Sequence, residues 1–254
     1  MSLDAGARLR YIFIIKMKSN FKIANREGNE TPNTHIVVGH YGSGKTEFAV
    51  NYALQKRKTG CEVALADLDI VNPYFRVRQE ADMLEERGIH VVSSSLGNDW
   101  RQDLPALSGE LQSFFVESGR VNVVDVGGDA VGARVLARFG DAIAGCAHDL
   151  WLVVNANRYE TQTARQAAAF AADIMNTCDL RFTGVINNTH MLRETEMEDI
   201  LRGSRVVQEA CSLLNVPCVY TVCPEHLLEP CREARGHIPG ELFPIKLYMR
   251  PSYL

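Results

Sequence analysis

The stretch "GHYGSGKT", residues 39–46, decides the fold, because it fits the pattern G-x-x-x-x-G-K-[ST]. The apolar run "IVVG" leads into it, and "TEFAVNYALQKRKTG" continues from Thr46 with apolar residues on one helical face. Glycines between a strand and a helix let the backbone curl so that its N–H groups face an anion, and the helix N-terminus adds the positive end of its dipole. The stretch therefore predicts a phosphate-binding loop.

The motif also assigns roles to individual side chains. Lys45 is expected to contact the β- and γ-phosphates of a nucleoside triphosphate, and the hydroxyl of Thr46 is expected to bind Mg²⁺. The residues of this region that we expect to contact the nucleotide are Gly39, His40, Tyr41, Gly42, Ser43, Gly44, Lys45, Thr46 and Glu47.

Acidic residues stand at the ends of two further predicted strands. Asp67 and Asp69 end "CEVALADLD", and Asp125 precedes the glycine turn of "VVDVGGD", in which Gly128 has no side chain to keep a γ-phosphate away. Ligands of open α/β sheets bind at the carboxyl edge, and a magnesium-bound triphosphate needs carboxylates near the metal and a group that holds the attacking water. We expect the three acids to converge on the loop. An alternative is that Asp67 and Asp69 only form the turn before Asn72.

Short runs of Val, Ile and Leu alternate with helical patterns along the chain. This order predicts an α/β three-layer sandwich with a doubly wound, mostly parallel sheet of about seven strands. The predicted strands are "IVVG", "CEVALADLD", "IHVVSSS", "VNVVDVGG", "DLWLVVNA", "FTGVINN" and "CVYTV", and "IKLYMR" near the end of the sequence has the period-two pattern of one more. Residues 1–33 are polar toward their end and predict an arm or linker that is a candidate for disorder, followed by a single domain, residues 34–254.

The composition limits the classes of partner and compartment. The net charge is −4 and no apolar run has the length of a membrane helix, so we expect no nucleic-acid partner and no stable membrane anchor. The seven cysteines include no C-x-x-C pair, which favours reduced thiols in a cytoplasmic protein over a disulfide or zinc framework.

With these residues in view, the sequence resembles the MinD/ParA/CobQ/nitrogenase-iron-protein class of P-loop NTPases. The segments that carry the resemblance are "GHYGSGKT", "DLDIVN", "DVGGDAVG", "GVINNTH" and "TVCPEH". The resemblance implies that Asp69 orients the attacking water, that Asp67 and Asp125 lie near the metal, and that Gly128 senses the γ-phosphate. It also implies that Asn188 contacts the base and that Pro224 and Glu225 cover it.

The sequence departs from this class at two positions. MinD/ParA proteins carry a signature lysine where this chain has His40, so an ATP-bridged homodimer stays open. His40 has three interpretations: a spacer, a phosphate contact, or a substitute for the lysine in a dimer. The iron protein has a cluster-binding cysteine where this chain has Gly132, so we expect no iron–sulfur cluster.

The leading hypothesis from the sequence is a Mg²⁺-dependent ATPase of low turnover that acts as a switch on a protein partner. "GSGKT" without the lysine also resembles the metallochaperone GTPases, but "NNTH" lacks the carboxylate of their guanine-reading N-K-x-D, which favours ATP. A small-molecule kinase or ligase would need a substrate pocket, for which "GNDWRQDLP" is the candidate lining. A nucleotide-binding regulatory module without hydrolysis is the fourth alternative. Surface candidates for partner contacts are "QKRK" and residues 74–76, whereas Arg134 and Arg138 are either arginine-finger-like phosphate contacts or ordinary surface residues.

Overall fold

The computed structural model describes residues 32–68, 80–93, 112, 114–115, 119–128 and 130–249. The chain divides into two units, Met1–Thr31 and Pro32–Leu254, and the description that follows concerns the second. The predicted arm therefore lies almost wholly outside the described residues, as do Asp69, residues 74–76 and the "GNDWRQDLP" segment.

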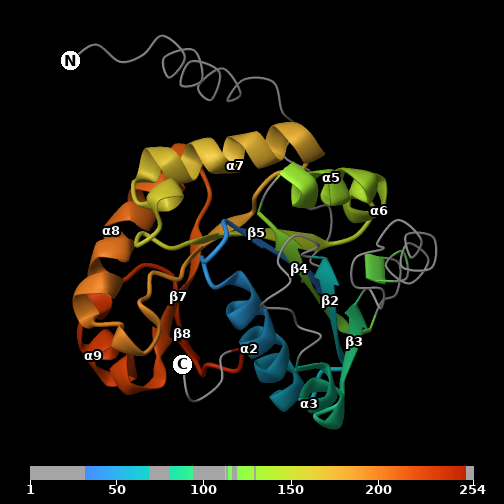
Figure 1. Cartoon of the computed structure of the whole chain (residues 1–254), viewed down its shortest axis with the longest axis horizontal. Coiled ribbons are helices and arrows are strands. Elements are labelled where there is room, and N and C mark those ends of the chain that lie inside the picture. The colour runs from blue at the N-terminus through green and yellow to red at the C-terminus, as the bar shows by residue number, and fades with distance from the viewer. Residues whose placement is uncertain are drawn as a thin grey trace. The chain divides into compact units, whose positions relative to one another are not determined.

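Eight parallel strands form one sheet in the order β3-β2-β4-β1-β5-β6-β7-β8 (Figure 1). The strands are β1 (Thr34–Gly39), β2 (Val63–Leu68), β3 (Ile89–Ser93), β4 (Val121–Gly127), β5 (His148–Val154), β6 (Gly184–Asn187), β7 (Cys218–Pro224) and β8 (Glu241–Ile245). The predicted doubly wound parallel sheet is confirmed, and its order reverses beside β1, which leads into the predicted phosphate-binding loop. In open α/β sheets such a switch point is where ligands bind.

Helices cover both faces of this sheet (Figure 1). They are α2 (Lys45–Lys58), α3 (Ala81–Glu86), α5 (Ala130–Arg138), α6 (Gly140–Ala144), α7 (Ala164–Cys178), α8 (Met197–Leu214) and α9 (Leu228–Glu233). In β1, Ile36 and Val38 belong to the core beneath α5–α8, whereas Val37 belongs to the core beneath α2 and α3. Short 3₁₀ turns η3 (Tyr159–Thr161), η4 (Leu192–Glu194), η5 (Glu225–Leu227) and η6 (Arg235–His237) lie in the connections. Among the helices built from described residues, none is long and apolar enough to cross a membrane.

The prediction of a strand at "IKLYMR" is wrong. The eighth strand, β8, ends at Ile245, and residues 246–249, called the strap below, leave the sheet. Pro244 can lie within β8 because this strand forms the edge of the sheet, where a missing N–H breaks no ladder. The strap instead takes its hydrogen-bond partners from side chains of α2.

Helix α2 is buried more completely than its sequence pattern predicts. The pattern places Phe48, Ala49, Tyr52 and Ala53 on one apolar face, but every residue from Lys45 to Leu54 is buried. The sheet covers one side of the helix and the strap contacts another, so polar residues near its N-terminus are enclosed as well. Burial also raises the pKa of the Tyr52 hydroxyl, which keeps it neutral within the aromatic cluster under this helix.

Candidate nucleotide-binding site

The glycine-rich stretch forms a tight loop between β1 and α2. Gly42 and Gly44 have φ angles of 75° and 78°, in the left-handed region that side chains other than glycine rarely adopt. The N–H of Ser43 donates to the carbonyl of His40 at 3.0 Å, which closes the turn. The loop therefore has the backbone that the motif requires, and α2 begins at Lys45 with its N-terminus facing the loop.

Two side chains from distant loops hold carbonyl groups of this turn. The Arg158 Nε donates to the Gly42 carbonyl at 3.0 Å, and the Asn188 Nδ2 donates to the Ser43 carbonyl at 2.8 Å. In a trans peptide the C=O and the following N–H point in opposite directions. Because Asn188 binds the Ser43 carbonyl, the N–H of Gly44 points away from Asn188. Contacts of this kind fix the direction of the N–H groups before any anion arrives.

Two of the predicted acids lie beside the start of α2. The Thr46 hydroxyl donates to Asp125 Oδ2 at 2.6 Å, and Asp125 is fully buried in β4. Asp67 is the direct neighbour of Asp125 in the register of β2 with β4, and it is also buried. The structure thus brings Thr46, Asp67 and Asp125 together. The third acid, Asp69, lies outside the described residues.

Gly128 and Gly132 lie against backbone atoms that leave no room for a side chain. A Cβ on Gly128 would stand 2.1 Å from the Gly39 carbonyl oxygen, so this turn packs directly on the phosphate-binding loop. A Cβ on Gly132 would stand 1.8 Å from the Gly127 carbonyl oxygen. The position where the iron protein has its cysteine therefore accepts only glycine in this backbone.

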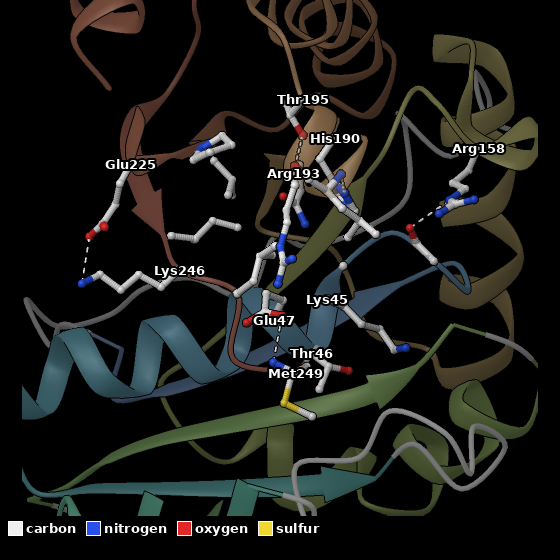
Figure 2. A pocket seen from close by; sticks show the side chains of 18 of the residues that line it. Lys45, Thr46, Glu47, Arg158, His190, Arg193, Thr195, Glu225, Lys246 and Met249 are labelled. Carbon is white, nitrogen blue, oxygen red and sulfur yellow. Dashed lines mark hydrogen bonds and ion pairs between the residues drawn. The ribbon is translucent and has the colours of Figure 1, made fainter. Parts of the chain in front are cut away.

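A cavity of about 700 Å³ opens beside the loop and has two chemically different ends (Figure 2). One end carries the loop backbone, Lys45, Thr46 and Arg158. The other end holds the apolar residues of the lining, which form a recess. Its lining residues come from the chain after β6, the end of β7 with η5, the end of β8 and the strap. The apolar ones are Leu192, Val222, Pro224, Ile245, Leu247 and Met249, and the polar or charged ones are His190, Arg193, Thr195, Glu225, His226 and Lys246. This size and lining are typical of a site for a small organic ligand.

The three residues predicted to surround a base all line this cavity: Asn188, Pro224 and Glu225. The Glu225 carboxylate stands 3.5 Å from the Lys246 amine, and both side chains are more than half exposed. Glu47 also lines the cavity, and its carboxylate accepts hydrogen bonds from the backbone of the strap. Direct contacts of these four residues with a nucleotide stay predictions.

His40 turns away from the cavity. Its Nδ1 stands 3.1 Å from the Tyr41 carbonyl oxygen and 3.5 Å from a Glu160 carboxylate oxygen, and its ring meets Phe170 edge-on at 5.7 Å. Because both polar neighbours are acceptors, this geometry needs a proton on Nδ1. In this conformation His40 packs against η3 and α7 of its own chain, which favours the spacer interpretation over a phosphate contact.

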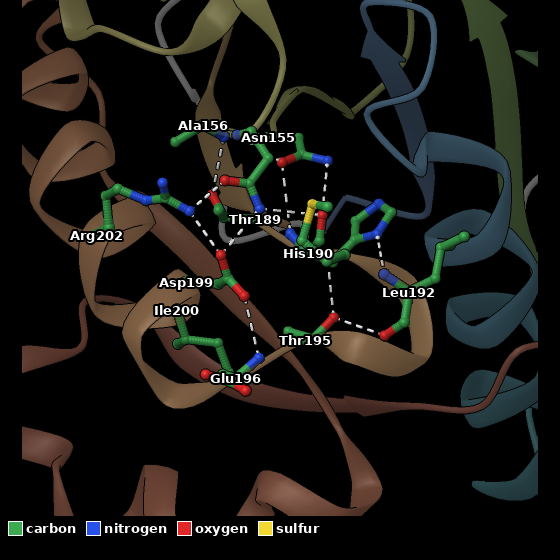
Figure 3. Close-up of polar contacts among 12 residues, drawn as sticks. Asn155, Ala156, Thr189, His190, Leu192, Thr195, Glu196, Asp199, Ile200 and Arg202 are labelled. Carbon is green, nitrogen blue, oxygen red and sulfur yellow. Dashed lines mark hydrogen bonds and ion pairs between the residues drawn. The ribbon is translucent and has the colours of Figure 1, made fainter.

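Several residues of the site escaped the sequence analysis, because they follow strands that carry no recognised motif. Asn155 donates toward the His190 carbonyl (Figure 3) and toward the Gly42 carbonyl. Asn157 donates to the His190 carbonyl and to Asp199. Arg202 of α8 completes this network through Asn157 and Asp199. The polar run "NANR" directly after β5 was the available signal, since it stands at the same sheet edge as the loop.

Arg134 and Arg138 are exposed on α5 and are not among the residues that line the cavity, which favours ordinary surface residues over phosphate contacts. All seven cysteines are free thiols. The part of the chain that the structure describes contains no group of three or more His, Cys, Asp or Glu side chains that could hold a metal ion.

Solved structures with a similar fold include several FtsY proteins. FtsY from Thermotoga maritima is 20% identical with a TM-score of 0.50, covering 87% of this chain and 71% of that one. FtsY from Elizabethkingia anophelis in complex with GDP is 19% identical with a TM-score of 0.50, covering 85% and 64%. Chloroplast FtsY from Physcomitrella patens is 17% identical with a TM-score of 0.52, covering 85% and 65%.

This chain thus spans less than two thirds of the last two structures. No protein-family model and no curated protein matches its sequence. At such identities the likeness concerns the fold, which is the doubly wound fold of P-loop NTPases. The closer resemblance to MinD and ParA stays a prediction.

Proposed function

We propose that this chain binds ATP with Mg²⁺ and hydrolyses it slowly, and that the nucleotide acts as a switch on a cytoplasmic protein partner. One observation carries the proposal: a single cavity joins a phosphate-binding loop at one end to an apolar recess at the other. A nucleoside triphosphate has the same two chemical halves, an anionic tail and a flat base.

The loop end supplies what a metal-bound triphosphate requires. We assign Lys45 to the β- and γ-phosphates and the Thr46 hydroxyl to Mg²⁺, and both residues line the cavity. Asp125, which accepts from Thr46, would orient that hydroxyl, and Asp125 and its neighbour Asp67 would bind waters around the ion. Bound there, Mg²⁺ would neutralise charge on the phosphate oxygens.

Hydrolysis would depend mainly on positioning and charge stabilisation. Lys45 and the loop N–H groups would bind the charge that develops on the phosphate oxygens, and Asp69 is our candidate for orienting the water. Phosphoryl transfer of this kind is slow without additional stabilising groups, so low turnover is expected. The ATP-bound form would then last long enough for a protein partner to bind it selectively.

The choice of ATP over GTP rests on His190. It occupies the position of the N-K-x-D carboxylate, lines the cavity, and accepts the Leu192 N–H through its Nδ1 at 3.2 Å. A GTP-dependent metallochaperone-type protein is the second candidate, and a specific observation favours it. The Glu225 carboxylate lines the recess, where it could accept hydrogen bonds from the N1 and N2 groups of guanine.

Titration calorimetry of the full chain with Mg·ATP and with Mg·GTP tests both candidates, and phosphate release tests hydrolysis. We expect tighter binding of ATP, and loss of binding in Lys45→Ala. Tighter binding of GTP would replace the first candidate by the second. Binding of either nucleotide with no phosphate release over many hours would support the alternative of a regulatory module that binds the nucleotide without hydrolysing it. A kinase or ligase would instead release phosphate only when its second substrate is supplied.

A further inference from the structure

The strap is fastened to α2 by side chains and not by the sheet. The Asn51 Nδ2 donates to the Lys246 carbonyl at 2.8 Å, and its Oδ1 accepts from the Lys246 N–H at 2.9 Å. The Glu47 carboxylate accepts from the N–H groups of Tyr248 at 2.6 Å and of Met249 at 3.1 Å. Two side chains on adjacent turns of one helix therefore bind four backbone groups of the strap.

The same strap forms one wall of the apolar recess. Lys246, Leu247 and Met249 line the cavity, and Figure 2 shows Lys246 and Met249 beside Glu47 and Glu225. The ion pair between Glu225 and Lys246 links the strap to the loop after β7. Because no strand ladder reaches the strap, its position depends on these side-chain contacts together with the burial of Met249.

The strap also stabilises the negative charge of the Glu47 carboxylate. Glu47 lines the same cavity as Lys45 and Thr46, so its carboxylate would share that cavity with the anionic tail of a bound nucleotide. A buried carboxylate there opposes a second anion unless hydrogen-bond donors stabilise its charge. The two N–H groups of the strap supply those donors.

We propose that Glu47 and Asn51 are positioning residues for the base end of the site: they hold the strap as the wall against which the base and ribose pack. The inference rests on the proposed nucleotide-binding function and adds to it. It gives Glu47 a different role from the one predicted from the sequence: Glu47 holds the strap in place and does not contact the nucleotide. It also makes the strap part of base selection, since Leu247 and Met249 shape the recess.

The test compares two ligands that share only the phosphate tail. Affinities of the full chain for Mg·ATP and for Mg·tripolyphosphate are measured by calorimetry in the wild type, in Asn51→Ala and in Gln55→Ala. Gln55 is an exposed residue of the same helix, so it controls for changes in helix propensity. We expect Asn51→Ala to weaken ATP binding about tenfold, as for the loss of two hydrogen bonds, with tripolyphosphate binding within about twofold of wild type.

The possible results distinguish failure of the proposed role of the strap from failure of the proposed nucleotide-binding function. Equal ATP affinity in Asn51→Ala and Gln55→Ala would overturn the inference, as would an equal loss for both ligands in Asn51→Ala. A wild type that binds neither ATP nor GTP would instead overturn the proposed function. If Asn51→Ala does not fold, Glu47→Gln takes its place, because it keeps one acceptor for the strap. We expect it to weaken ATP binding about threefold while leaving tripolyphosphate binding at or above the wild-type value.

Discussion

The Thr46 hydroxyl donates a 2.6 Å hydrogen bond to Asp125, a fully buried carboxylate 79 residues further along the chain. This contact joins the first turn of α2 to the middle of the sheet. Because the hydroxyl proton is donated to Asp125, the oxygen lone pairs remain available to another partner. A hydroxyl prepared in this way suits a small hard cation such as Mg²⁺.

Asp125→Asn should therefore change the response to magnesium. The amide can still accept from Thr46 but carries no charge, so we expect the affinity for Mg·ATP to fall by about 10–100-fold, the usual effect of changing a residue that supports a metal ligand. ATP binding measured in excess EDTA should change little. Asp141→Asn on the exposed side of α6 is the matched control. An unchanged magnesium dependence would show that Asp125 only supports the fold.

The phosphate-binding loop was predictable because its constraints are local. The glycine spacing of Gly42 and Gly44 demands left-handed backbone, and the strand before the loop and the helix after it follow from short-range patterns. The parallel sheet was predictable for the same reason. Strand ends identified in the sequence also placed Asp67 beside Asp125, since parallel strands end at one edge.

The strap and the apolar recess were not predictable in this way. "IKLYMR" alternates like a strand, but Asn51 and Glu47, some 195 and more residues earlier, bind its backbone and remove residues 246–249 from the sheet. Arg158 reaches the loop only through the order of β1 and β5 in the sheet, which no local pattern encodes. Long-range topology therefore decides which side chains complete the site.

Arg158→Ala should weaken the binding of phosphates and not of the base. Its Nε holds the Gly42 carbonyl, and loss of one hydrogen bond of this kind costs about 0.5–1.5 kcal/mol, or about two- to tenfold in affinity. We expect this loss for ATP and for tripolyphosphate alike, in contrast to Asn51→Ala. Arg205→Ala, an exposed arginine on α8, serves as the control. An effect on ATP alone would assign Arg158 to the base end.

His40→Ala should leave nucleotide affinity nearly intact and lower turnover modestly. The side chain contacts Glu160 and Phe170 and not the cavity, so its removal frees the edge of the loop without removing a phosphate ligand. Calorimetry and phosphate release on the same preparation measure both quantities, with Lys45→Ala as the reference for a true phosphate ligand. A loss of affinity as large as that of Lys45→Ala would mean that His40 reorients to bind phosphate.

Gly203→Ala tests whether α8 sets the position of the chain after β6. A Cβ at this position would lie 2.1 Å from Thr189 Oγ1 and 2.6 Å from Asn187 Oδ1, two atoms that already share a 2.9 Å hydrogen bond. Alanine normally favours a helix over glycine, but here we expect overpacking to dominate and to lower the free energy of unfolding by about 1–3 kcal/mol. Urea denaturation measures this change.

The matched control is Gly236→Ala, where no atom beyond the two chain neighbours lies within 4 Å of the added Cβ and the free energy of unfolding should hardly change. The displaced Thr189 would also shift the neighbouring Asn188, whose amide holds the Ser43 carbonyl, so nucleotide affinity should fall together with stability in Gly203→Ala. A variant that is destabilised but binds ATP with wild-type affinity would show that the phosphate-binding loop keeps its shape without Asn188. The direction of the loop N–H groups would then be set by the glycine backbone and Arg158 alone.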